Sequence, residues 1–172
     1  MTRNPIGKLV AFVVALIAAI VVAIPAAADG PTKAPVVNTP GELDGFCSFP
    51  LFVSFPVNDE TIKTFYDSAG NPVRSLVEGH LVVTISRLDP TTKAVLASMT
   101  ENLSGPGQIV YNADGSQTIT FLGNSGVFIM VRSQPTLLLT SGRVVVVAAS
   151  PTSLGILISA VGTQTNVCTL LS

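Results

Sequence analysis

His80 is the only imidazole in the chain, so a Ser-His-Asp triad or a histidine-containing metal site would have to use it. Alternation along the chain places His80 on the polar side of a short strand, together with Thr84 and Ser86. Glu78 lies two residues earlier on that side, which makes a Glu–His acid–base pair conceivable. A solvated surface pair explains the same spacing, so we expect an exposed His80 and assign no catalytic residue.

Three other motifs have residue types that could do chemistry, and each fits a turn better than a site. Gly123-Asn124-Ser125-Gly126 lacks the Gly-x-Ser-x-Gly spacing of a nucleophile elbow. Asn112-Ala113-Asp114-Gly115 resembles a calcium loop, but its glycine comes two positions early. Ser104-Gly105-Pro106-Gly107 has no lysine and no following helix, so it is not a phosphate loop. We therefore expect neither a metal nor a cofactor.

Arg87 is the one candidate for ligand binding that the sequence offers. It has the same parity as Leu81, Val83 and Ile85, so a regular strand would point its guanidinium inward. An inward arginine could bind the carboxylate of a ligand. If the strand ends near Ser86, the side chain reaches water instead.

The composition of the 172-residue chain limits its class. Apolar residues make up 48% and charged residues 11%, whereas a disordered chain needs few apolar residues and many charges. The formal net charge is −1, which argues against a basic surface for nucleic acid.

The N-terminus has the order of a secretory signal peptide. Arg3 and Lys8 are followed by the apolar run 9–24, by Pro25 and by Ala26-Ala27-Ala28. The run is shorter than the ~20 residues of a membrane-spanning helix. We expect cleavage after residue 28, secretion and no membrane contact afterwards; the alternative is an uncleaved membrane anchor. Loss of Arg3 and Lys8 would change the net charge from −1 to −3.

Period-two patterning follows a segment rich in proline and glycine, residues 29–45, which we interpret as a linker. In residues 47–58 the odd positions are all apolar and the even positions are mostly small or polar, while Pro50 and Pro56 argue against a helix. We therefore predict a single antiparallel β domain over residues 46–172. Its further strands are predicted at 60–66, 73–77, 80–86, 94–101, 108–112, 117–122, 127–132, 143–149 and 154–161.

Turn residues separate these strands. Asp114-Gly115 is the clearest hairpin signal, because this pair tolerates the positive φ of a tight connection. Further turns are predicted at residues 67–72, 89–92, 123–126 and 141–142. Short strands at this spacing predict an all-β fold, either a small antiparallel β-barrel of roughly eight to ten strands or a β-sandwich.

The two cysteines, Cys47 and Cys168, lie at opposite ends of the predicted domain. In an exported chain a pair of cysteines favours one disulfide, the alternative being two buried thiols. A bridge between the first and last strands would make them neighbours, as happens when a sheet closes on itself. We therefore prefer the barrel to the sandwich.

The order of several short motifs resembles a group of small secreted actinobacterial proteins without an established activity. These motifs are Cys-x-Phe-Pro at 47–50, Ser-Gly-Pro-Gly at 104–107, Asn-x-Asp-Gly-Ser at 112–116, Ser-Gly-Arg-Val-x-Val at 141–146 and the late Cys168. The resemblance implies export and a β fold, and it implies no site residues.

These observations favour a secreted, non-catalytic and monomeric module that binds a small apolar ligand or associates with the cell envelope. Barrels of about eight strands can hold one small ligand, and the predicted inward faces are apolar. One alternative is an enzyme with an apolar barrel cavity, similar to allene oxide cyclase. Another is a secreted interaction or inhibitor module. Nucleic acid is not an expected partner.

Overall fold

The computed structural model describes residues 30–172, so the predicted signal segment, 1–28, lies outside the described residues. The fold is all-β, as predicted. Its elements are β1 (Thr32–Pro35), β2 (Gly41–Leu43), β3 (Leu51–Asn58), β4 (Thr61–Tyr66), β5 (Pro72–Glu78), β6 (Leu81–Leu88), β7 (Val95–Asn102), β8 (Gly107–Tyr111), β9 (Gln117–Val131), β10 (Gln134–Ala148), β11 (Gly155–Asn166) and the short helix α2 (Val167–Leu170).

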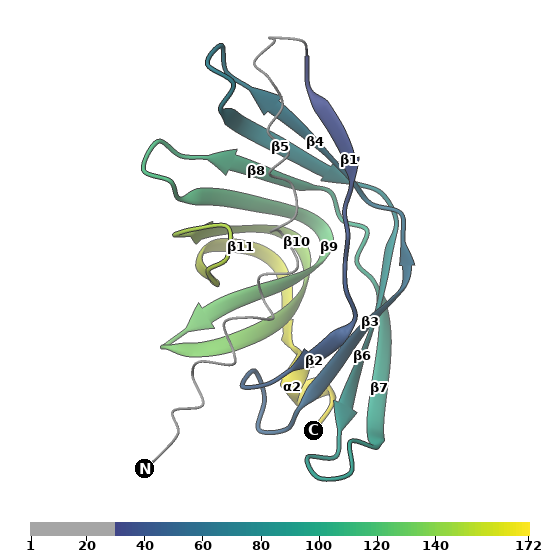
Figure 1. The fold of residues 1–172 in the computed structure, drawn as a ribbon. Helices are drawn as coiled ribbons and strands as arrows, with labels where there is room; N and C mark the ends of the chain where they lie inside the picture. The colour runs from purple at the N-terminus through teal and green to yellow at the C-terminus, as the bar shows by residue number, and fades with distance from the viewer. Residues whose placement is uncertain (1–29) are drawn as a thin grey trace, which may run out of the picture.

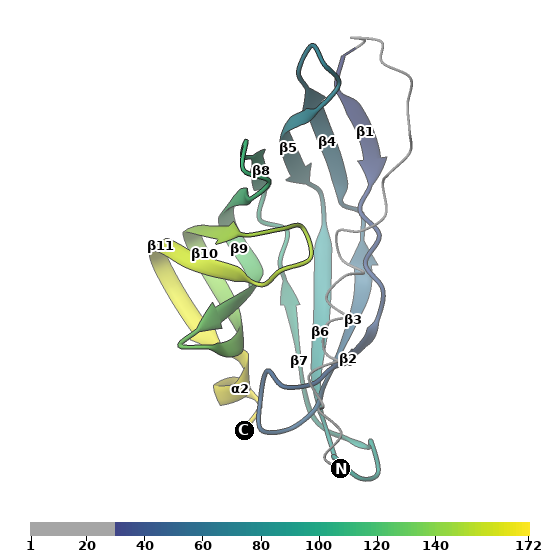
Figure 2. The ribbon, with the colours of Figure 1, turned by 60° about the vertical axis from the view of Figure 1, so that its left-hand side comes forward.

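The strands form two sheets that face each other (Figures 1 and 2). One sheet has seven strands in the order β1-β4-β5-β8-β9-β10-β11, and the other has four in the order β2-β3-β6-β7. Neighbouring strands in these orders are antiparallel; one additional short parallel pairing joins the start of β11 to β9, at Gly155 and Ile129.

Over residues 30–172 these sheets do not close into a barrel, so the preference for a barrel was wrong. The physical reason lies at the end of the larger sheet. There β9, β10 and β11 curl so strongly that β11 comes back onto β9. The last strand therefore pairs within its own sheet and not with β2 or β7 of the smaller one.

Long bent strands connect the two sheets. β3 and β4 are separated only by residues 59–60, and β5 and β6 only by residues 79–80. Since β3 pairs with β6 and β4 pairs with β5, the chain passes from one sheet to the other twice, at two points that lie side by side. Bends of this kind form the corners of packed sheets. The corner requires Gly79, whose φ is +140°; an added Cβ would lie 2.6 Å from Cα of Glu60. Asp59 N–H donates to the His80 carbonyl across the corner, at 2.8 Å.

A row of three glycines crosses the curled end of the larger sheet. Gly142 of β10 pairs with Gly123 of β9 on one side and with Gly162 of β11 on the other. All three have positive φ, at +73° for Gly123, +130° for Gly142 and +114° for Gly162. A Cβ on Gly142 or Gly162 would collide with a carbonyl oxygen of the facing strand. Glycine is therefore needed for the three strands to bend together.

This row corrects two predicted turns. Residues 123–126 and 141–142 lie inside the long strands β9 and β10, and they do not separate shorter strands. The true turn between these strands is at Arg132 and Ser133, with φ of +48° and +65°. Two successive positive φ values are typical of a type I′ hairpin, which usually carries Asn-Gly. Arg and Ser are not the residue types of such a turn, so the sequence did not predict it. The predicted hairpin at Asp114-Gly115 is confirmed between β8 and β9.

Part of the predicted linker, 29–45, is structured. β1 pairs with β4 and β2 pairs with β3, so residues 32–35 and 41–43 each add an edge strand to one sheet. Proline is compatible with an edge strand, where an N–H can be lost without breaking a central ladder.

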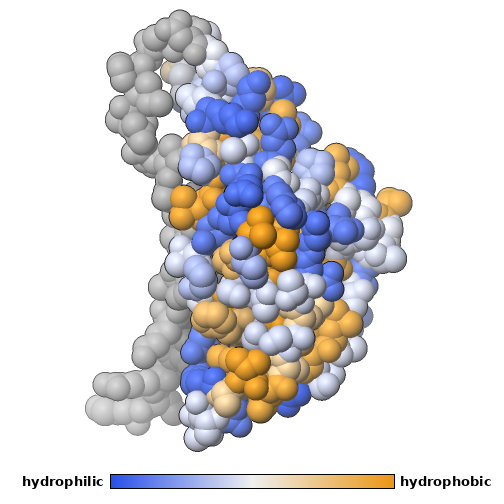
Figure 3. Space-filling model, turned by 90° about the vertical axis from the view of Figure 1, so that its right-hand side faces the viewer, coloured by the Kyte–Doolittle hydropathy of each residue, from blue (hydrophilic) through white to orange (hydrophobic). Residues whose placement is uncertain are grey.

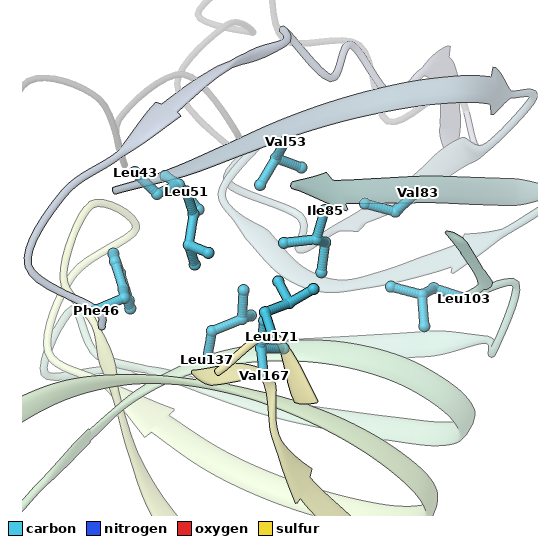
Figure 4. Packing of buried hydrophobic residues seen from close by; sticks show 10 residues of the cluster. All are labelled: Leu43, Phe46, Leu51, Val53, Val83, Ile85, Leu103, Leu137, Val167 and Leu171. Atoms are coloured by element: carbon cyan, nitrogen blue, oxygen red, sulfur yellow. The ribbon is translucent and has the colours of Figure 1, made fainter. Parts of the chain in front are cut away.

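The hydrophobic core fills the space between the sheets. Ten buried side chains from both sheets, from the connecting segments and from the C-terminal segment point toward one another (Figure 4). A second cluster lies inside the curl and contains Val127, Ile129, Val144 and Val146. On the outer face shown in Figure 3, hydrophobic and hydrophilic residues are interspersed.

The predicted disulfide is confirmed, but its surroundings differ from the expectation. Cys47 lies in the connection before β3, and Cys168 lies in α2, with their Cα atoms 5.4 Å apart. The bridge therefore ties a loop to the C-terminal helix and does not join two neighbouring strands. Asn166 caps α2 by accepting a hydrogen bond from Cys168 N–H at 2.8 Å.

We predict that Gly79→Ala destabilises the protein by about 1–3 kcal/mol, because φ of +140° is strained for alanine and the new methyl group would meet the facing corner. Gly70→Ala is the matched control: its φ is also positive, at +84°, but no atom lies within 4 Å of the added Cβ. Urea denaturation followed by circular dichroism should show the larger loss at Gly79. Equal losses would mean that close packing at the corner is unimportant.

Candidate binding pocket between the sheets

An apolar cavity of about 330 Å³ lies between the two sheets. Both sheets line it: Val83 and Ile85 of β6 belong to one wall, and Ile119 and Phe121 of β9 to the other. Its volume is at the lower end of the range for pockets that hold small molecules. The size and lining are those of a site for a small, mainly apolar ligand.

Strand alternation explains why apolar side chains meet here. On β6, Leu81, Val83 and Ile85 share the inward face, as the sequence predicts, and all three line the cavity. On β9, Ile119 and Phe121 do the same from the opposite sheet. Residues 36–39 between β1 and β2, and Pro151, Ser153 and Leu154 between β10 and β11, also line it.

Six polar residues interrupt this apolar wall: Asn38, Thr39, Glu60, Gln117, Ser125 and Ser153. Three of them are almost fully buried, with exposures of 8% for Glu60, 2% for Gln117 and 4% for Ser125. Within the described part of the chain, no hydrogen-bond partner is found for Asn38 Oδ1, Gln117 Oε1 or Ser125 Oγ. Buried polar atoms without partners are rare and costly, so three on one cavity wall need an explanation.

The two β9 residues are held by the backbone of the larger sheet. Gln117 begins β9, pairs with Tyr111 and Ala148, and has the same parity as Ile119 and Phe121. Ser125 lies beyond the Gly123 bend, and its carbonyl accepts a hydrogen bond from Thr140 Oγ1 at 3.3 Å.

Gly105 lets the segment between β7 and β8 pass close to Ser125. Its N–H donates to the Asn124 carbonyl at 2.9 Å, and an added Cβ would lie 2.9 Å from Ser125 Oγ. Larger side chains would not fit here. The glycine of the Ser-Gly-Pro-Gly motif therefore has a packing role beside the cavity.

Glu60 and Asn38 belong to the corner side of the wall. Asn38 Nδ2 donates to Asn58 Oδ1 at 3.1 Å and makes a long contact to Glu60 Oε2 at 3.5 Å. Asn58 Nδ2 in turn donates to the Val36 carbonyl at 3.0 Å. Burial raises the pKa of the Glu60 carboxyl above its ordinary value, and the Asn38 hydrogen bond opposes that rise only in part.

The three candidate site residues named from the sequence, Glu78, His80 and Arg87, lie outside this cavity. His80 is exposed at the corner, as is Glu78, and no hydrogen bond or ion pair links them in residues 30–172. Arg87 does lie on the inward side of β6, which continues to Leu88. Its Nη1 donates to the Leu171 carbonyl at 3.2 Å, and its Cζ lies 4.6 Å from the Phe49 ring centroid.

Arg87 thus anchors the C-terminal segment, and ligand binding by Arg87 stays a prediction. Within the described range, no three His, Cys, Asp or Glu side chains are grouped closely enough to hold a metal ion. No helix of the described residues is long and apolar enough to cross a membrane.

Sequence reasoning assigned none of these polar residues to a site. For Gln117 a signal existed: it is a polar residue on the parity of Ile119 and Phe121, which is where an apolar side chain is expected. For Asn38 and Glu60 no local signal existed, because their proximity depends on the pairing of β1 with β4.

Comparison with known proteins adds no relative: no family model, no curated protein and no solved structure matches this chain.

We predict that Glu60→Gln stabilises the protein relative to wild type by an amount that grows with pH. Since the native pKa is raised, the native state keeps a proton that the unfolded chain has lost above its ordinary pKa of about 4.3. Wild-type stability is therefore penalised as the pH rises through that window, whereas glutamine does not titrate.

Urea denaturation of wild type and Glu60→Gln at about pH 4 and at about pH 7 measures the difference in their free energy of unfolding at each pH. Glu101→Gln is the control, since Glu101 is exposed on β7. A pH-independent difference for Glu60→Gln would contradict the assigned effect of burial.

Proposed function

We propose that this chain is a secreted, non-catalytic module that holds a small apolar ligand between its two sheets. The observation that carries the proposal is the cavity of about 330 Å³ with an apolar wall and a few buried polar groups. Small-molecule sites are usually lined by apolar side chains, with a few polar groups placed among them.

The disulfide supports the compartment. Cys47 and Cys168 are bonded, which suggests an oxidising, extracellular environment, since such bonds persist there and are rare in the cytosol. Together with the signal-like N-terminus this favours export. The non-catalytic part of the proposal rests on the separation of His80 from the cavity: the one imidazole is exposed and does not line the wall.

The neutral fluorophore N-phenyl-1-naphthylamine, which brightens in apolar surroundings, tests the proposal. We predict saturable binding to wild type and a loss of at least about tenfold in affinity for Val83→Phe, because the larger ring occupies the cavity. Ile119→Phe fills the opposite wall and serves as a second blocking variant.

Val82→Phe is the matched control, since Val82 is the neighbour of Val83 on the same strand and does not line the cavity. It should bind the fluorophore as wild type does. Equal binding by folded Val82→Phe, Val83→Phe and Ile119→Phe would place the probe elsewhere and refute the cavity as the site. Binding only to cell-envelope preparations, with none of the fluorophore, would favour envelope association in its place.

A further inference from the structure

The charge of the cavity wall limits which head group a ligand can carry. Among the described residues that line the cavity, Glu60 is the one ionisable side chain, and none is a lysine, arginine or histidine. Glu60 is 8% exposed, and its carboxyl makes no ion pair in the described part of the chain. A carboxylate, sulfate or phosphate head group would find no counter-charge here and would face an acidic group.

The unpaired atoms show what the head group must supply. Hydrogen bonds fix the amide orientations of Asn58 and Asn38, one after the other. The Val36 carbonyl is an acceptor, so the Asn58 atom that faces it must be Nδ2. Asn58 Oδ1 therefore faces Asn38 and accepts a hydrogen bond from Asn38 Nδ2. Among the described residues Asn38 Oδ1 is left as a buried acceptor without a partner, and the residue Asn38 lines the cavity together with Glu60. A hydrogen-bond donor on a ligand that reaches this side chain would satisfy the acceptor.

From these two observations we propose that the cavity takes a single-chain amphiphile whose head group donates hydrogen bonds and carries no negative charge, such as a primary amine or an alcohol. The head group binds at Asn38 and Glu60, and the chain lies along the apolar wall. The inference deepens the proposed function and rests on it. Gln117 Oε1 and Ser125 Oγ are further unpaired groups that a second polar atom of the ligand can satisfy.

The test compares three probes of equal chain length: decylamine, decanol and decanoate. Each is titrated at neutral pH against the protein loaded with N-phenyl-1-naphthylamine, and displacement of the fluorophore is measured. Decylamine should displace it best and decanol next, and decanoate should be weaker than decylamine by at least about tenfold, since its charge is buried without a counter-ion and leaves the acceptor unpaired.

Two variants test which groups select the head group. Glu60→Gln should reduce the advantage of decylamine over decanol, because it removes the negative charge that attracts an ammonium group. Asn38→Leu should reduce the affinity of decanol, because it removes the amide that accepts the hydroxyl proton. The matched controls Glu101→Gln and Gln164→Leu alter exposed residues outside this cavity and should leave all three affinities unchanged. Circular dichroism and fluorophore binding verify that each variant is folded.

The outcomes separate the two proposals. Equal displacement by all three probes would overturn the head-group inference while leaving the apolar pocket in place, and so would tighter binding of decanoate. Absence of fluorophore binding to wild type would refute the pocket and the inference together. Discrimination that persists unchanged in both Glu60→Gln and Asn38→Leu would also overturn the inference, because the selecting groups would then lie elsewhere.

Discussion

The row of glycines across β9, β10 and β11 is the constraint on which the rest of the structure depends. At Gly142 and Gly162 the backbones of neighbouring strands approach so closely that any side chain would collide with a carbonyl oxygen. The three strands therefore bend together, and the sheet curls until β11 meets β9. This curl ends the larger sheet on itself and sends the chain into α2, where Cys168 reaches Cys47. A flat sheet at this point would leave the cavity without its far wall.

The cavity has an energetic cost that the fold does not recover by its own contacts. Asn38, Gln117 and Ser125 each leave a buried polar atom unpaired, and a leucine at position 117 would match its neighbours better. Local departures from the rules of packing are expected where a protein binds something. The raised pKa of the Glu60 carboxyl belongs to the same pattern, because burial of this group lowers stability above its ordinary pKa.

Sequence patterning predicted those features that depend on neighbouring residues. The all-β class, the inward face of Leu81, Val83 and Ile85, and the hairpin at Asp114-Gly115 all follow from period two and turn chemistry. The disulfide followed from the number of cysteines and the expected compartment.

Features that depend on pairing between distant strands were not predictable. Gly123 and Gly142 were predicted to lie in turns. That they form a shared bend is seen only when β9 and β10 are paired. Pro35 likewise suggests a linker, and its place in an edge strand depends on the pairing of β1 with β4. The same pairing brings Asn38 to the cavity wall. The barrel was wrong for the same reason: closure depends on where the last strand lies, and its curl onto β9 is a property of three strands together.

The most direct test of the account is the position of a bound apolar probe. Nuclear Overhauser effects between N-phenyl-1-naphthylamine and the methyl groups of the labelled protein report which side chains lie against it. The account predicts contacts from Val83 on one sheet and Ile119 on the other in the same complex, since both line the cavity. Contacts confined to exposed residues such as Val95 and Leu96 of β7, with none from Val83 or Ile119, would contradict it.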